Sequence, residues 1–171
     1  MKKEDKIIAE FIQNALYRLD ESTRMIVKSL EELSDDELWR RPNNVSNSIA
    51  NLILHLCGNI GQYAISSLGE TTDIRNRDSE FSTDGGMNKT ELLAALNKTV
   101  DKAKEIIESA TIDRLLQKRE VQGFHFSGIG IVIHVVEHYS YHTGQIAFWV
   151  KQLKNKDLGF YEGIDLNIKN E

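Results

Sequence analysis

HVVEHYSYHTGQ (residues 134–145) places three histidines at a constant spacing of four residues, in a chain of 171 residues that has only five histidines. An α-helix advances ~100° per residue, so residues four apart differ by only ~40° around the axis. His134, His138 and His142 therefore form one narrow stripe on a predicted helix. Gln145 and four apolar residues project onto the same side, so we expect the stripe to face the core: Ile131, Val135, Trp149 and Leu153.

A buried histidine stripe favours a metal site. A neutral imidazole in a core needs a partner for its ring nitrogens, and a divalent ion supplies one. Two histidines four residues apart on a helix can reach one ion at ~2.0 to 2.1 Å. His134 and His142 lie ~12 Å apart along the axis and cannot easily share an ion. The spacing alone therefore leaves two pairs open, His134 with His138 or His138 with His142.

A third ligand has to come from another part of the chain, and His55 is the natural candidate. It lies in a second predicted helix, on a face whose other members are polar: Ser48, Asn51, Asn59 and Gln62. Such a stripe either faces solvent or lines a cavity. Opposite an inward histidine stripe, the cavity is the favoured interpretation. Cys57 lies ~200° from His55 around the helix and cannot point at the same ion; we expect it to behave as a buried, apolar-like thiol.

Apolar periodicity predicts an all-α fold, a four-helix bundle formed by residues 1–171 as a single domain. Residues 34–41 add a short helix, and residues 118–121 a short extended piece. The polar segment 70–87 is long for a connection within one domain, so we expect it to be a long crossover loop between the second and third helices. The four long helices are expected at about residues 3–32, 47–68, 89–109 and 128–153.

Capping residues support these helix starts. Ser34 and Asn88 are each followed three residues later by a glutamate, Glu37 and Glu91, which is the pattern of a capping box. The predicted starts at about residues 47 and 128 have a serine directly before them. We predict that these caps are Ser46 and Ser127.

Composition excludes several classes of function. The chain has 21 Lys and Arg against 26 Asp and Glu, a formal net charge of -5, which argues against a nucleic-acid groove. No segment reaches the ~18 to 20 consecutive apolar residues of a membrane helix. The N-terminal residues lack a signal-peptide pattern. A single cysteine excludes an intrachain disulfide. We therefore expect a cytoplasmic protein without membrane or nucleic-acid partners.

The sequence resembles a known superfamily at this point. LILHLCGNI (residues 52–60) and HVVEHYSYHTGQIAFWVKQL (residues 134–153) are similar to the DinB/YfiT-like superfamily, and RNRDSEF (residues 75–81) fits its DUF1572-like branch of small bacterial proteins. The resemblance implies a four-helix bundle in up-down-down-up order, often dimeric. Because His142 directly precedes Thr-Gly-Gln, it also implies His55, His138 and His142 as the metal ligands. Many members have Arg where this chain has Thr143.

The resemblance also implies a chemistry. Its characterised members include thiol-dependent transferases, such as bacillithiol S-transferases and mycothiol-dependent maleylpyruvate isomerase. Three neutral histidines leave open positions on Zn²⁺ or Ni²⁺, where a bound water or thiol becomes a nucleophile at neutral pH. We expect a metal-dependent thiol S-transferase or related hydrolase that acts on a small-molecule substrate, with a low-molecular-weight thiol as cosubstrate. The alternative is a non-catalytic metal-binding or stress-associated dimeric bundle.

Five other features complete the expectations. His134 is expected to support the site rather than to ligate, and His125, between two phenylalanines, to pack. Arg75 and Arg77 are expected to pair with nearby acids at the surface; binding the carboxylates of a thiol cofactor is the alternative. The helix at 128–153 is apolar on almost every side, which favours burial in an isologous homodimer.

Overall fold

A computed structural model describes residues 2–170 of the chain. It is predominantly helical, which confirms the predicted all-α class. Short elements join the long helices: α2 (Asp35–Trp39), α4 (Arg77–Ser82), α6 (Ile112–Leu116) and the hairpin of β1 (Lys118–Val121) with β2 (Phe124–Ser127). The long helices are α1 (Lys3–Glu31), α3 (Ile49–Ile60), which continues as the π-helix η1 (Gly61–Leu68), α5 (Lys89–Glu108) and α7 (Gly128–Lys154).

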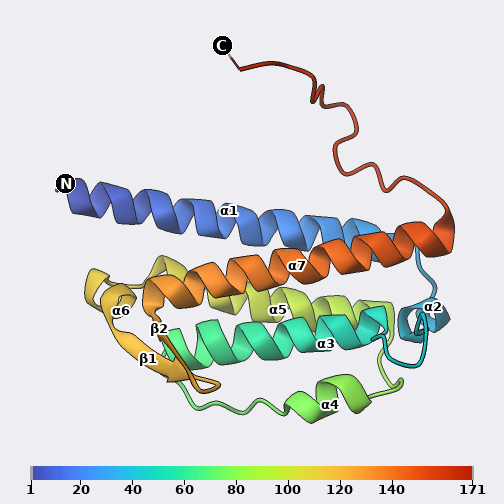
Figure 1. Cartoon of the computed structure of the whole chain (residues 1–171), viewed down its shortest axis with the longest axis horizontal. Helices are drawn as coiled ribbons and strands as arrows, with labels where there is room; N and C mark the ends of the chain where they lie inside the picture. Colours follow the sequence, from blue (N-terminus) through green and yellow to red (C-terminus); the bar gives the residue numbers. More distant parts are fainter. Residues whose placement is uncertain (1, 171) are drawn as a thin grey trace.

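The four long helices pack side by side around one cluster of buried apolar side chains. Figure 1 shows α1 and α7 running in one direction, and α3 and α5 in the opposite one. The chain therefore follows the up-down-down-up order that the resemblance implies. Between η1 and α5 the chain crosses back along the outside of α3, and α4 lies on this crossover (Figure 1). This segment places α4 against the helix that carries His55.

Three predicted caps are confirmed and one is wrong. Ser34, Asn88 and Ser127 each accept a hydrogen bond from a backbone N–H of the first turn. The second long helix is capped by Ser48 and not by Ser46. The Ser48 hydroxyl accepts from the Asn51 backbone N–H, and the Asn51 side chain accepts in return from Ser48. The helix therefore begins two residues later than predicted.

The second long helix is not regular along its length. From Gly61 to Leu68 it widens into a π-helix, in which the backbone N–H of Gly69 donates to the Ala64 carbonyl at 3.0 Å. Such widened turns are frequent at functional sites. Here the widened turn carries Tyr63, whose buried ring stacks on His134 at 4.0 Å between centroids. Periodicity alone predicted an uninterrupted helix.

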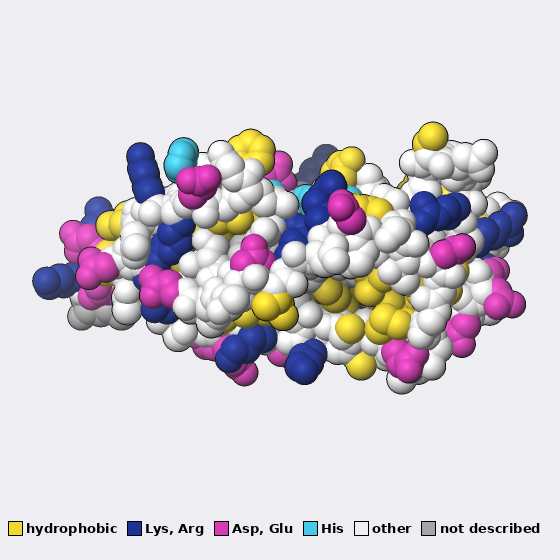
Figure 2. All heavy atoms as spheres, turned by 90° about the horizontal axis from the view of Figure 1, so that it is seen from below, with side chains coloured by type: hydrophobic (Ala, Val, Ile, Leu, Met, Phe, Trp, Pro, Cys, Tyr) yellow, Lys and Arg dark blue, Asp and Glu magenta, His cyan; other side chains and the backbone are white. Residues whose placement is uncertain are grey.

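The outer surface bears on partners. Figure 2 shows basic and acidic side chains interspersed over one face, with neither sign forming a continuous field there. Among residues 2–170, no helix combines the length and the apolar character needed to cross a bilayer. α7 is not buried all round in the single chain: Ile133, Tyr141 and Phe148 are 52%, 61% and 64% exposed. A second copy of the chain could cover these exposed apolar side chains, so the homodimer stays a prediction.

Candidate metal centre

The structure brings together three histidines that lie far apart in the sequence. His55 comes from α3, and His138 and His142 come from successive turns of α7. One nitrogen from each ring can be chosen so that all three lie within 4.8 Å of one another. The Nε2 atoms of His55 and His138 are 2.9 Å apart. The other polar residues of this α3 face are buried as well, except Gln62, which is partly exposed: Ser48, Asn51 and Asn59.

A carboxylate holds the outer nitrogen of His55. Glu80, in α4, places Oε2 2.9 Å from His55 Nδ1. An ionised carboxylate only accepts, so Nδ1 carries the proton and donates, and the Nε2 lone pair faces the cluster. A carboxylate behind a histidine in this way fixes the ring orientation and the tautomer of a metal ligand.

Arg75 holds Glu80 in turn. Its Nε donates to Glu80 Oε1 at 2.7 Å, and a terminal nitrogen donates to Oε2 at 2.9 Å. The two side chains are only 4% and 7% exposed. The prediction of surface pairing is therefore wrong for Arg75, because the crossover segment folds it inward against α3. Arg77 lies over the Phe81 ring, 4.9 Å from its centroid, and does not join the cluster.

Two residues of α3 make room for this segment and anchor it. The Asn51 amide donates to the backbone carbonyls of Glu80 and Thr83, at 3.0 and 2.8 Å. Gly58 lies one turn beyond His55, and a Cβ at this position would overlap the Glu80 carboxylate. Glu80 and Gly58 were not predicted as site residues. For Gly58 the signal was a glycine inside a helix, one turn from a candidate ligand.

The second histidine of the cluster with an oriented ring is His142. Its Nδ1 donates to the side-chain carbonyl of Gln145 at 2.7 Å, which leaves Nε2 unprotonated. Thr143 is buried, and its hydroxyl donates to the Tyr139 carbonyl at 2.8 Å. Gln145 is thus a hydrogen-bond partner of the cluster, whereas Thr143 bonds only the backbone of its own helix.

The protonation state of the cluster suits a cation. Burial lowers the pKa of His55 and of His142, although the Glu80 and Gln145 partners oppose this. Burial, with repulsion from the neighbouring rings, lowers the pKa of His138 to about 3. All three rings are therefore neutral at pH 7. Neutral imidazoles are the form that binds divalent metals, so this donor set fits a divalent metal ion.

The other singled-out residues lie outside the cluster. His134 stacks on Tyr63, and its Nε2 accepts from Asn59 at 3.2 Å, in agreement with a supporting position. His125 is exposed on β2, so the predicted packing role is wrong; the hairpin carries it into solvent. Cys57 is partly buried, and burial raises the pKa of its thiol to about 11.

The fold and the cluster define a helical-bundle protein with a three-histidine site able to hold a metal ion. Residues 6–162 match the family described as "Protein of unknown function (DUF1572)", and the chain belongs to that family. The uncharacterized protein YjoA of Bacillus subtilis (strain 168) is 25% identical over 137 residues, which cover 77% of this chain and 84% of YjoA.

Three solved structures share the fold. The crystal structure of YjoA, a DinB-like protein, matches with a TM-score of 0.64 at 19% identity over 89% of this chain and 96% of that one. A conserved protein from Enterococcus faecalis matches with a TM-score of 0.72 at 14% identity, covering 84% and 97%. A DinB-like protein from Bacillus cereus ATCC 10987 matches with a TM-score of 0.66 at 14% identity, over 91% of this chain and 95% of that one. These likenesses establish the fold.

Proposed function

We propose that this protein is a metal-dependent enzyme, a thiol S-transferase of the bacillithiol type or a related hydrolase. His55, His138 and His142 hold one divalent ion, Zn²⁺ or Ni²⁺. The observation that carries the proposal is the approach of these three rings, neutral at pH 7, with one of them backed by a buried carboxylate. Three neutral histidines whose other ring nitrogens are held by hydrogen-bond partners are the pattern of a catalytic metal site.

The residues around the three histidines each have a defined role in the proposed site. Glu80 and Gln145 accept hydrogen bonds from the Nδ1–H groups of His55 and His142. Both Nε2 lone pairs are thereby directed toward the proposed ion. Arg75 holds the Glu80 carboxylate in place by a two-point contact. The bound ion would act as a Lewis acid and lower the pKa of a thiol or water.

The number of protein ligands favours a catalytic metal site over a purely structural one. Within residues 2–170, the cluster contains three His, Cys, Asp or Glu side chains and no fourth. Structural zinc sites are closed by four protein ligands, whereas catalytic ones keep a position for water or substrate. The non-catalytic alternative, a metal-binding or stress-associated dimeric bundle, requires that a fourth protein group completes the coordination sphere.

The remaining parts of the proposal concern setting and partners. We propose a cytoplasmic, single-domain protein, residues 1–171, that forms a homodimer and acts on a small molecule with a low-molecular-weight thiol as cosubstrate. The exposed apolar side chains of α7 support the dimer. The single cysteine and the acidic balance of charge support the compartment and the absence of nucleic acid among the partners.

Two measurements test the proposal. Elemental analysis of protein purified without an affinity tag should find about one divalent ion per chain, and His138→Ala should lose it. The metal-loaded protein should then consume a thiol, bacillithiol or glutathione, when it is offered a panel of electrophiles. Full metal retention by His138→Ala would overturn the ligand assignment, and a panel without any thiol consumption would overturn the transferase.

A further inference from the structure

A cavity of about 600 Å³ opens one helical turn from the histidine cluster. Its walls include Leu52 of α3 and Gln145 of α7, which lie three residues from His55 and His142 respectively. Three residues of α-helix correspond to a rise of ~4.5 Å. Gln145 belongs to both places, because its carbonyl accepts from His142 while its side chain lines the cavity. The cavity therefore lies directly beside the candidate metal site, at a size typical of small-molecule pockets.

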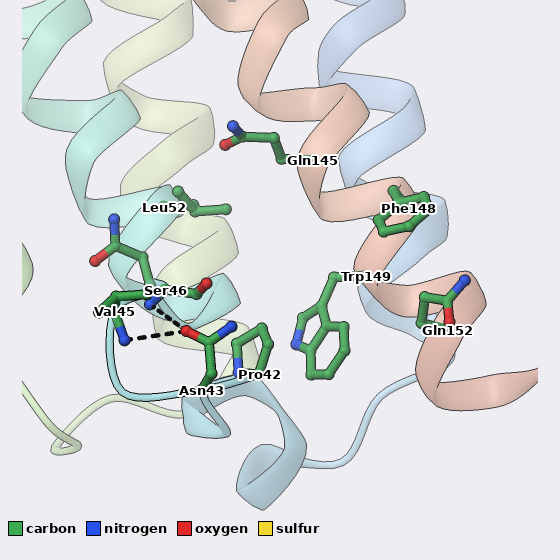
Figure 3. A pocket seen from close by; sticks show the side chains of 10 residues that line it. Pro42, Asn43, Val45, Ser46, Leu52, Gln145, Phe148, Trp149 and Gln152 are labelled. Atoms are coloured by element: carbon green, nitrogen blue, oxygen red, sulfur yellow. Dashed lines mark hydrogen bonds between the residues drawn. The ribbon is translucent and has the colours of Figure 1, made fainter.

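The outer wall of the cavity is a turn with its own hydrogen bonds. The Asn43 side-chain carbonyl accepts from the backbone N–H groups of Val45 and Ser46, at 3.0 and 2.9 Å (Figure 3). Arg41 ties the same turn to the neighbouring segment by donating to the carbonyls of Ser46 and Phe81. Phe81 directly follows Glu80 in α4. The wall is thus braced against the segment that orients His55, which is a preformed arrangement.

The lining of the cavity is uncharged. Of the described residues that form it, none is Lys, Arg, Asp, Glu or His. An ion that entered would lose water and find no opposite charge in the wall, which is unfavourable. The lining combines apolar and neutral polar side chains (Figure 3): Pro42, Val45, Leu52, Phe148 and Trp149 with Asn43, Ser46, Asn47, Gln145 and Gln152.

Two of these side chains have hydrogen-bond donors that the protein leaves unused. The Trp149 Nε1–H is buried and has no acceptor among residues 2–170. Figure 3 shows this nitrogen on the edge of the indole that faces the Pro42 ring. Gln145 uses its carbonyl for His142, and its amide NH₂ has no acceptor within the described chain. Unused donors in an apolar wall select for an acceptor on the ligand.

We propose that this cavity binds the second substrate of the metal site, and that this substrate is an uncharged molecule with an apolar or aromatic body and a hydrogen-bond acceptor such as a carbonyl or nitro oxygen. Trp149 and Gln145 donate to the acceptor, and Phe148 and Leu52 cover the body. The inference rests on the proposed function only in calling the bound molecule a substrate. The cavity and its uncharged wall are independent of the metal.

A matched pair of probes tests the charge preference. The full chain, stripped of metal with a chelator, is titrated with para-nitroacetophenone and with para-nitrobenzoate by ligand-observed NMR. The two probes share a nitrophenyl ring and differ in the charge of one substituent. The ketone should bind about tenfold more tightly, because only the carboxylate has to leave water as an ion. Equal or tighter binding of the carboxylate would overturn the proposal.

Variants locate the binding. Gln152→Lys adds an ammonium group at the rim and should move the preference about fivefold toward the carboxylate, while Gln152→Met, of similar size, should leave it within about twofold. Trp149→Phe keeps an aromatic ring but removes the N–H, and should weaken ketone binding about fivefold, as expected for one neutral hydrogen bond. Unchanged affinities in Gln152→Lys and Trp149→Phe would place the probes elsewhere and overturn the proposal.

The outcome is separable from the transferase test. If the metal-free chain binds the ketone with the expected preference and the loaded chain consumes no thiol, the proposed function fails and the cavity assignment stands. If the loaded chain consumes thiol and the cavity variants bind both probes as the unaltered chain does, the function stands and the cavity assignment fails.

Discussion

Glu80 Oε2 lies 2.9 Å from His55 Nδ1, and both side chains are almost completely buried. The two residues are 25 positions apart and meet because the crossover segment folds back onto α3. This contact connects the fold to the candidate metal centre. It makes the orientation of one candidate ligand, His55, depend on a segment that belongs to none of the four long helices.

Glu80→Gln should destabilise the metal-free protein by about 3 kcal/mol, because it leaves the buried Arg75 guanidinium without its counter-charge. The Gln carbonyl can still accept from His55, so the loss reports on the ion pair. Urea unfolding in the presence of a chelator measures it. Adding Arg75→Leu removes the stranded charge, so the double variant should be more stable than Glu80→Gln alone. A double variant that is less stable would contradict this account.

Gly58→Ala should weaken metal binding by about 10- to 100-fold, the range for loss of a partner behind a ligand. The added Cβ overlaps the Glu80 carboxylate and pushes it away from His55. Competition with a chromogenic chelator measures the affinity. Gly61→Ala is the matched control, since a Cβ there meets nothing within 4 Å and the backbone is helical, with φ of -56°. Equal affinities of the two variants would mean that Glu80 does not orient the ligand.

The long helices and the histidine stripe of α7 could be predicted from the sequence because both leave a periodic signal. Residues four apart on α7 share one face whatever surrounds the helix. The capping boxes at Ser34 and Asn88 are local patterns of the same kind. Ser46 was a wrong cap because it and Ser48 are both serines near the same helix start. Only the reciprocal bond with Asn51 distinguishes them.

The buried Arg75–Glu80 pair could not be predicted in this way. Both residues lie in a polar segment without periodicity, where surface pairing is the usual outcome. Their burial depends on a long-range contact, the two bonds from Asn51 to the backbone of that segment. The widening of the helix after Gly61 likewise depends on tertiary packing and has no established sequence pattern.

Glu37→Gln should lower the melting temperature at pH 7, with an effect that disappears in acid. Lys154 Nζ donates to both Glu37 oxygens at 2.7 Å and joins α2 to the end of α7. This contact, with bonds from Ser34, lowers the pKa of Glu37 from 4.5 to about 2. Because the carboxyl pKa is lower in the folded state, the contact stabilises the fold fully above pH 4.5. This stabilisation is lost as the pH falls toward 2.

Gln is a suitable replacement because it keeps the capping box with Ser34, so the variant isolates the contact with Lys154. Melting curves of both proteins between pH 7 and pH 2 measure the difference. Lys154→Met should show the same pH dependence, and combining the two substitutions should add little. A difference that persists unchanged at the acid end would assign the effect to the cap and not to the ion pair.

His134→Gln should keep one metal ion per chain, with an affinity within about tenfold of the unaltered protein, because His134 acts through Asn59 and Tyr63 and not as a ligand. His138→Gln removes a ligand and should lose stoichiometric metal. Isothermal titration with Zn²⁺ after chelator treatment compares the two. Spacing on α7 permits His134 with His138 as well as His138 with His142. If His134→Gln abolished binding and His142→Gln spared it, the first pair would be the ligand pair, and the Gln145 contact to His142 would have no role in the metal site.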